Sequence, residues 1–211
     1  MPRDKVKQGI TPFNILSLDN AHFHRGTEGT FLFHQTELTE QLAKQLGAIG
    51  FTTVLHTDMK PVIYGKLLLN LNNALNAVAN QPIKTQLENH KLRKVYAAAQ
   101  REWLAVAKAE GVELAQYTGV KPSWLPRLLS LPNWLYLRLA KAMMDIDPHA
   151  RSSMWEDISS GRKTEIEFLN EAVVRRAEIL GIDAPVNRKI SALIHSLEQG
   201  ETVSLDSLYK S

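Results

Sequence analysis

The sequence contains no cysteine, and this absence excludes several kinds of site at once. The 211-residue chain can form no disulfide, no thiolate nucleophile and no cysteine-ligated zinc site. It has no uninterrupted apolar run of about 18 residues, so we expect no transmembrane helix. Residues 1–30 carry no long apolar stretch, and we therefore expect no secretory signal and a cytoplasmic protein.

The chain also lacks a large excess of basic or acidic side chains. The 25 basic and 22 acidic side chains leave a formal net charge of +3, without a block of consecutive basic residues. This balance argues against nucleic acid as a partner. Apolar residues make up 44% of the chain, whereas glycine and proline number only 11 and 9. The composition therefore excludes a disordered or linker-rich chain and permits a sizeable core.

The chain changes character after residue 59. Before that point, residues 10–18, 30–34 and 51–55 are rich in β-branched, aromatic and leucine residues and predict strands. Leucine and isoleucine recur at spacings of 3 and 4 over residues 38–49, which predicts a helix. This N-terminal part therefore predicts a small β-β-α-β segment.

After residue 60 nearly every segment predicts a helix. Apolar residues at helical spacing, or a long stretch without proline, indicate helices over residues 62–79, 92–106, 166–180 and 186–197. Gly111 and Gly181 follow two of these segments and are typical of helix ends. Residues 117–132 hold three prolines and must be broken into short pieces. The fold class is accordingly mostly α.

A polar stripe on the first of these helices is the first candidate site. Lys66, Asn70 and Asn73 lie at positions i, i+4 and i+7 and share one face, while leucines crowd the others. Polar groups on a largely buried helix must be hydrogen-bonded or must face a cleft. The alternative is an ordinary amphipathic helix with a solvated asparagine face.

A second candidate lies in the segment SSMWED, followed by GRKTE. Ser153 and Glu156 have the spacing of a capping box, which predicts that Ser152 and Ser153 lie where a helix begins and that free N–H groups there suit a carboxylate. Thr164 and Glu165 are expected to open the next helix. Two ordinary helix starts are the alternative interpretation.

Two further segments invite a functional interpretation that we do not favour. His22 and His24 would share one face of a strand and suggest a metal, but an exposed hairpin explains them better, and no metal is expected. Residues 124–144 combine tryptophan, leucine and basic residues, as membrane-surface helices do. Their prolines break the period, so we expect no membrane partner.

Four segments occur together in a recognisable order: TPFNILSLDNAHFHRGTEG, GKLLLNLNNALNAV, IDPHARSSMWEDISSGRKTEIEFLN and GIDAPVN. Together they resemble the ketopantoate reductase (2-dehydropantoate 2-reductase) family from about Thr11 to Leu197. The resemblance implies a helical substrate-binding and catalytic domain over residues 60–211, similar to the C-terminal domain of 6-phosphogluconate dehydrogenase. Residues 1–59 would be the last part of an NADP-binding Rossmann domain.

The resemblance also implies roles for individual residues. Lys66 matches the lysine that donates a proton to the ketone oxygen, and Asn70 matches an asparagine that contacts the substrate. Asn73 matches a second such asparagine, although its spacing from Lys66 is one residue shorter than in some members, so that Asn72 or Asn76 could take the role. Ser153 matches a substrate-binding serine, and Glu165 matches the acid that receives the hydroxyl group of the substrate.

One departure from the family limits what the chain can do by itself. The Gly-x-Gly-x-x-Gly loop that holds the pyrophosphate of NADPH is missing from these 211 residues. We therefore expect the chain to be truncated or half of a split enzyme that reduces ketopantoate or another 2-keto acid with NADPH, and to be inactive by itself. Its partner would be a separate Rossmann-domain polypeptide or a second copy. The alternative is a non-catalytic helical module for binding or dimerisation.

Overall fold

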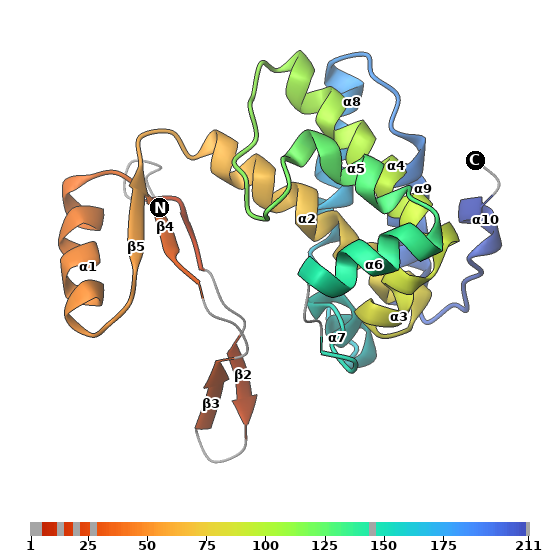
Figure 1. The fold of residues 1–211 in the computed structure, drawn as a ribbon, viewed down its shortest axis with the longest axis horizontal. Helices are drawn as coiled ribbons and strands as arrows, with labels where there is room; N and C mark the ends of the chain where they lie inside the picture. Colours follow the sequence, from red (N-terminus) through yellow and green to blue (C-terminus); the bar gives the residue numbers. More distant parts are fainter. Residues whose placement is uncertain (1–5, 12–14, 19–21, 26–28, 144–146, 210–211) are drawn as a thin grey trace. The chain divides into compact units, whose positions relative to one another are not determined.

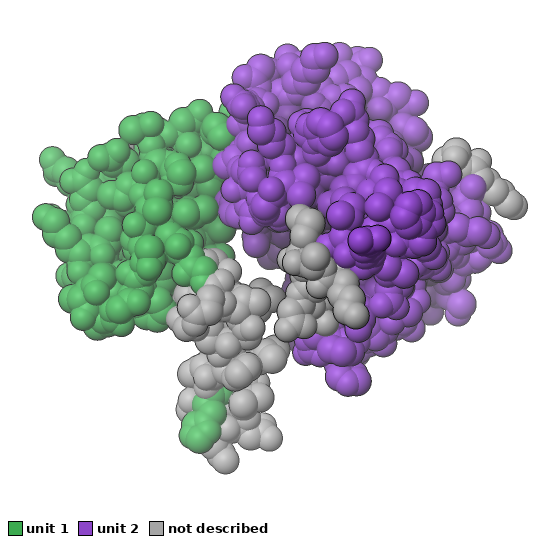
Figure 2. Space-filling view, in the orientation of Figure 1, with its two compact units in different colours: residues 1–63 green, residues 64–211 purple. Residues whose placement is uncertain are grey.

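The computed structural model describes residues 6–11, 15–18, 22–25, 29–143 and 147–209 (Figure 1). The chain divides into two compact units, Met1–Ile63 and Tyr64–Ser211, which Figure 2 colours separately. The first unit combines strands with one helix, and every described element that lies wholly in the second is helical. The expected fold class, mostly α with a small β-containing segment at the N-terminus, is confirmed.

The first unit is built on a parallel β-α-β crossover. Strands β4 (Phe31–His34) and β5 (Thr53–His56) pair in parallel and are joined by helix α1 (Glu37–Ala48), while β1 (Gly9–Ile10) pairs antiparallel with β4. The sheet order is β1-β4-β5. Parallel neighbours require such a crossover, which the sequence pattern over residues 30–55 predicts correctly.

The single strand expected over residues 10–18 is wrong. This stretch contains the end of β1 and all of β2 (Ile15–Leu18), and β2 pairs with β3 (His22–Arg25) in a separate two-stranded sheet. The sequence places Pro12 between β1 and β2, and a proline has no N–H to give to a strand ladder. The expected β-β-α-β order is therefore incomplete, whereas the hairpin expected at His22 and His24 is present as β2 and β3. Among the described residues, no group of three histidine or carboxylate side chains is placed to hold a metal.

Helix α1 exposes the apolar residues that its sequence pattern groups together. Its Thr36 cap accepts a hydrogen bond from the backbone N–H of Thr39, and the Thr39 hydroxyl accepts one from the N–H of Thr36. Leu38 is nevertheless 62% exposed, and Ile49, which follows the helix, is 70% exposed. Val54 of β5 is also exposed, so this unit presents apolar surface on both its helix and its sheet.

The second unit is a bundle of helices around α2 and α4. The longer helices are α2 (Lys60–Ala79), which begins in the first unit, α4 (His90–Ala109), α8 (Asn170–Ile179) and α9 (Pro185–Glu198). Shorter ones are α3 (Ile83–Glu88), η2 (Pro122–Trp124), α5 (Leu125–Leu129), α6 (Asn133–Met143), α7 (Ser153–Ser159), η3 (Ile166–Phe168) and α10 (Asp206–Tyr209). Within the described ranges no helix is both long and apolar enough to cross a membrane.

The core of the bundle is centred on the contact between α2 and α4. Leu71 and Leu75 of α2 and Trp103 of α4 are completely buried. The indole N–H of Trp103 donates to the backbone carbonyl of Tyr64 at 2.9 Å, so the largest core side chain also has its one polar group satisfied. Gly111 follows α4 with φ of +68°, as a left-handed residue past a helix end requires.

The continuous helix expected over residues 166–180 is wrong. The short 3-10 helix η3 covers the first residues, and the chain leaves helical geometry at Leu169, with φ −109° and ψ −102°, before α8 begins. Asn170 is completely buried there, and its side-chain amide donates to Asn187 of α9 at 2.9 Å. The first residue of α8 is therefore a buried, hydrogen-bonded amide, a feature that the spacing of apolar residues does not reveal.

Candidate functional site

The polar stripe predicted on α2 exists. Leu68, Leu71 and Leu75 turn into the core, whereas Lys66, Asn70 and Asn73 are only half-buried on another face of the helix. The side-chain ends of these three residues make no hydrogen bond or ion pair with any residue in the described part of the chain. One ammonium and two amides therefore line one helix face with free hydrogen-bonding capacity.

The setting of Lys66 changes its acidity. Burial lowers the pKa of the ammonium below its ordinary value, because transfer from water penalises the charged form. A lysine with a lowered pKa gives up its proton more readily. In its charged form the ammonium suits an anionic or carbonyl oxygen.

The start of α7 is held against α2 by Ser152. The Ser152 hydroxyl donates to the backbone carbonyl of Asn73 at 2.9 Å, and its backbone N–H donates to Asn76 Oδ1 at 2.9 Å. The same hydroxyl accepts a hydrogen bond from the N–H of Trp155 and so caps the helix. The helix start expected at Ser152 and Ser153 is therefore confirmed, but the capping box of Ser153 with Glu156 is wrong by one residue. Ser153 instead occupies the first helical position, exposed and next in sequence to the contact with Asn73.

The asparagines of α2 have different tasks. Asn76 is completely buried, and its side chain donates to Gln81 O and Gln86 Oε1 as well as accepting from Ser152. Its hydrogen-bonding groups are used within the fold, which argues against Asn76 as a ligand for substrate. Asn72 accepts from Gln86 at 2.7 Å and is half-buried. Asn73 is the one of the three whose side chain is uncommitted among described residues.

Glu165 lies apart from this group in the hydrogen-bond network. It is exposed at the start of η3, and the preceding Thr164 donates from both its N–H and its hydroxyl to Glu198 of α9. No described hydrogen bond connects Thr164 or Glu165 to α2 or α7. The structure therefore joins Asn73 to the residue beside Ser153, whereas Thr164, the neighbour of Glu165, is bonded to α9.

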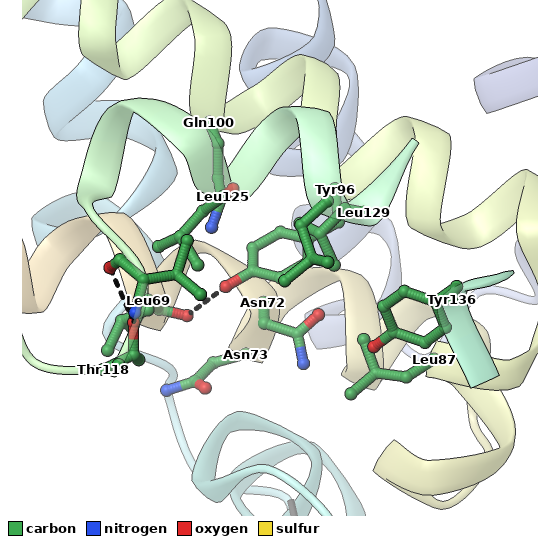
Figure 3. A pocket seen from close by; sticks show the side chains of 13 residues that line it. Leu69, Asn72, Asn73, Leu87, Tyr96, Gln100, Thr118, Leu125, Leu129 and Tyr136 are labelled. Carbon is green, nitrogen blue, oxygen red and sulfur yellow. Dashed lines mark hydrogen bonds between the residues drawn. The ribbon is translucent and has the colours of Figure 1, made fainter. Parts of the chain in front are cut away.

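A cavity of about 410 Å³ opens beside the stripe, within the second unit (Figure 3). Most of its wall is apolar, from residues that include Leu69, Leu87, Val120, Leu125, Leu128 and Leu129. Asn72, Asn73, Tyr96, Gln100 and Tyr136 add polar groups to the wall. Asn73 thus belongs both to the stripe and to the cavity, so one ligand can touch both.

Sequence reasoning missed most of this cavity. Gln100 lies on the buried face of α4, and a polar residue among apolar ones on that face is a signal that could have marked it as part of a site. Tyr136 lies in the leucine-rich segment around α6, where the sequence offers no pattern that marks it as part of a site.

Comparisons with known proteins agree on one family. The profile described as ketopantoate reductase PanE/ApbA C terminal matches residues 58–198. A 2-dehydropantoate 2-reductase of Archaeoglobus fulgidus is 25% identical over 202 residues, which cover 93% of this chain and 62% of that protein. The chain therefore spans less than two thirds of this relative.

Solved structures share the fold. A PanE/ApbA family ketopantoate reductase from Ralstonia eutropha JMP134 superposes with a TM-score of 0.73 and 26% identity, covering 91% of this chain and 59% of that one. A dimeric ketopantoate reductase from Staphylococcus aureus gives a TM-score of 0.74 at 19% identity, covering 95% and 64%. Because the family profile matches well over half of the residues, the chain belongs to the ketopantoate reductase family, of which it carries the C-terminal domain.

Proposed function

We propose that the second unit binds a 2-keto acid, ketopantoate being the family's substrate, and supplies the proton for its reduction to pantoate. The observation that carries this proposal is the stripe of Lys66, Asn70 and Asn73, whose side-chain ends are uncommitted among described residues. A substrate with a carboxylate next to a ketone offers several acceptor oxygens to one ammonium and two amides.

Lys66 has the chemistry of the proton donor. Hydride addition to the carbonyl carbon leaves negative charge on the ketone oxygen, which an adjacent ammonium stabilises and then protonates. The lowered pKa of Lys66 favours that transfer. Asn70 and Asn73 would orient the substrate, and Ser153 would reach it from the first turn of α7.

Glu165 is assigned to the hydroxyl group of the substrate by family resemblance alone. It is exposed and therefore accessible to a ligand. We propose that the substrate bridges the gap in the hydrogen-bond network between α2 and the segment that carries Glu165.

The described residues do not fit NADPH. The sequence lacks the glycine-rich loop, and the one helix of the β-α-β crossover carries Glu37 and Glu40 in its first turn, where they repel a pyrophosphate. We propose that the nicotinamide cofactor is bound by a Rossmann portion outside these 211 residues, in a split or longer enzyme of the cytoplasm. The exposed Leu38, Ile49 and Val54 support a docking partner for the first unit, either that portion or a second copy.

The same exposed residues also favour a second function. A non-catalytic module that has kept the family's helical domain would use its apolar surface to bind a partner or to dimerise. The two hypotheses differ in whether a ligand binds at the α2 stripe, because a non-catalytic module needs no ligand at Lys66.

Ketopantoate binding by the chain itself tests the proposal. Titration followed by calorimetry and by amide NMR should show saturable binding that shifts the signals of Asn70, Asn73 and Ser153. Lys66→Met should weaken binding at least tenfold. Lys94→Met, which removes an exposed lysine from α4, is the matched control and should leave affinity unchanged.

A second assay addresses turnover. NADPH oxidation should be absent with the chain alone and should appear when it is co-purified with a polypeptide that carries the missing Gly-x-Gly-x-x-Gly segment. Ketopantoate binding that is unaffected by Lys66→Met would contradict the proposed site. Absence of binding, together with self-association through the first unit, would favour the non-catalytic module.

A further inference from the structure

The cavity beside the stripe differs in character from the stripe itself. Lys66 and Asn70 do not line it, whereas Leu69, Asn72 and Asn73 do, so it occupies the adjoining face of α2. Figure 3 shows these α2 residues across from Tyr96 and Gln100 of α4 and near Tyr136 of α6. Thr118 and Gly119 at its wall are exposed, which provides a way in from solvent.

The size and wall of the cavity suit an organic group better than water. Liquid water takes about 30 Å³ per molecule, so about 410 Å³ is room for many waters, yet most of the wall has no group to bond them. Cavities that hold small organic ligands start at ~300 Å³. The short branched substituent of ketopantoate would leave much of this volume unfilled.

Two buried polar atoms in the wall lack a partner. Gln100 is 1% exposed and Tyr136 2%, and neither Gln100 Oε1 nor the Tyr136 hydroxyl has a hydrogen-bond partner among the described residues. The amide nitrogen of Gln100 is already committed to Leu68 O at 3.2 Å, so its free atom is an acceptor. The ring of Tyr136 is fixed by the Arg93 guanidinium, 4.0 Å from its centroid. An unpaired buried polar group is unfavourable, and a ligand with a hydroxyl group would give it a hydrogen-bond partner.

We propose that this cavity receives the substituent of the 2-keto acid, and that the preferred substituent is bulky, apolar or aromatic and ends in a hydroxyl group. The keto acid end lies along Lys66, Asn70 and Asn73, the ring passes Asn73 into the cavity, and the terminal hydroxyl bonds with the Tyr136 hydroxyl. This inference rests on the proposed function for the keto acid end. It adds the substrate class, aryl-substituted 2-keto acids, and the residues that select it.

Binding of a matched series of probes to the chain tests the inference. The probes are 4-hydroxyphenylpyruvate, phenylpyruvate, ketopantoate, and p-cresol, which has the ring and hydroxyl but no keto acid. We expect 4-hydroxyphenylpyruvate to bind about tenfold more tightly than ketopantoate. We expect p-cresol to bind weakly and to shift the amide signals of Leu69, Gln100 and Val120.

Two variants locate the ligand. Tyr136→Phe should weaken 4-hydroxyphenylpyruvate several-fold and leave phenylpyruvate unchanged, because only the hydroxyl contact is lost. Val120→Trp, in a loop, should fill the cavity and abolish binding of both aromatic acids. Val203→Trp, at another half-buried loop valine, is the matched control and should change neither affinity.

The outcomes separate this inference from the proposed function. If p-cresol does not bind, or if Tyr136→Phe weakens the two aromatic acids equally, the cavity does not select a hydroxylated ring and the inference is overturned, whatever ketopantoate does. If p-cresol binds but phenylpyruvate is insensitive to Lys66→Met, the link between cavity and stripe is overturned. Failure of ketopantoate to bind, with p-cresol bound as expected, counts against the proposed function alone.

Discussion

The Ser152 hydroxyl donates a hydrogen bond to the backbone carbonyl of Asn73 at 2.9 Å, across 79 residues of sequence. Together with the hydrogen bond from the Ser152 N–H to Asn76 Oδ1, this contact holds the first turn of α7 against α2. It places Ser153, which the family resemblance assigns to the substrate, beside the helix that carries Lys66. The candidate site therefore depends on a residue that does not itself reach the ligand.

Ser152→Ala should loosen α7 and weaken ligand binding together. The variant removes both the cap to the N–H of Trp155 and the bond to Asn73, and we expect it to cost about 1–2 kcal/mol of unfolding free energy. Hydrogen exchange should increase across residues 153–159, and ketopantoate affinity should fall several-fold. Ser159→Ala, near the exposed end of the same helix, should change neither. Unchanged exchange in Ser152→Ala would show that α7 is held by other contacts.

Gly65→Ala should destabilise the protein although alanine is the better helix former. A Cβ at Gly65 would lie 2.2 Å from the backbone carbonyl oxygen of Ala115, a distance that real Cβ atoms essentially never show. Either α2 or the segment after α4 must shift, and we expect a loss of about 2 kcal/mol or more. Because Lys66 is the next residue, ligand affinity should fall as well.

Gly47→Ala provides the matched comparison. Gly47 also lies within a helix, α1, but nothing lies within 4 Å of its added Cβ. Helix propensity alone then applies, and we expect a gain of about 0.5–1 kcal/mol. Urea unfolding of both variants measures the two effects, and equal signs for the two glycines would contradict the close approach at Ala115.

Sequence periodicity predicted α4 and α9 because each turns an apolar face to the core, and a long stretch without proline predicted α2. It failed where a polar residue sets the geometry. The break at Leu169 reflects the buried pair of Asn170 and Asn187, and the cap at Ser152 depends on Asn76, a partner 76 residues away. A local pattern contains no information about such distant partners.

The candidate site also has one part that the sequence predicts and one part that it does not. Lys66, Asn70 and Asn73 could be predicted as one face because a helix places i, i+4 and i+7 together. The cavity could not, since it is formed by α2, α4 and the α5–α6 region, whose packing no spacing predicts. The sequence likewise cannot separate Asn72, Asn73 and Asn76. They differ because Gln86 bonds Asn72 and Asn76, and Ser152 bonds Asn76.

Arg93→Leu should be among the most damaging substitutions in the bundle. The Arg93 side chain is fully buried without a carboxylate partner among the described residues, and its guanidinium donates to the carbonyls of Leu87, Leu129 and Leu131 and to Asn133 Oδ1. Removing it leaves these acceptors unpaired and Tyr136 unsupported, at a cost of about 3 kcal/mol or more. Thermal unfolding should show the loss, whereas Lys94→Leu, an exposed neighbour on α4, should change stability by less than about 0.5 kcal/mol.

The last prediction concerns His195, which joins α8 to α9. The imidazole Nε2 lies 2.5 Å from Glu171 Oε1, and Nδ1 lies 3.0 Å from Glu198 Oε2. These hydrogen bonds, the one to Glu171 foremost, raise the pKa of His195 above its ordinary value of 6.5. Burial alone would raise the pKa of Glu198, but hydrogen bonds from Thr164 and His195 lower it below 4.5. The cluster therefore stabilises the fold most between pH 4.5 and 6.5.

The sign of the pH dependence follows from these two shifts. The contribution of His195 is complete below pH 6.5 and is lost as the pH rises through its raised pKa in the folded state. His195→Gln should lower the unfolding free energy by up to about 1 kcal/mol near pH 5.5, and by less near pH 8.5, because the side chain is 45% exposed and solvent screens the pair. Glu171→Gln should reproduce most of this loss, and the double variant should add little. A loss that grows with rising pH would contradict the charged pair.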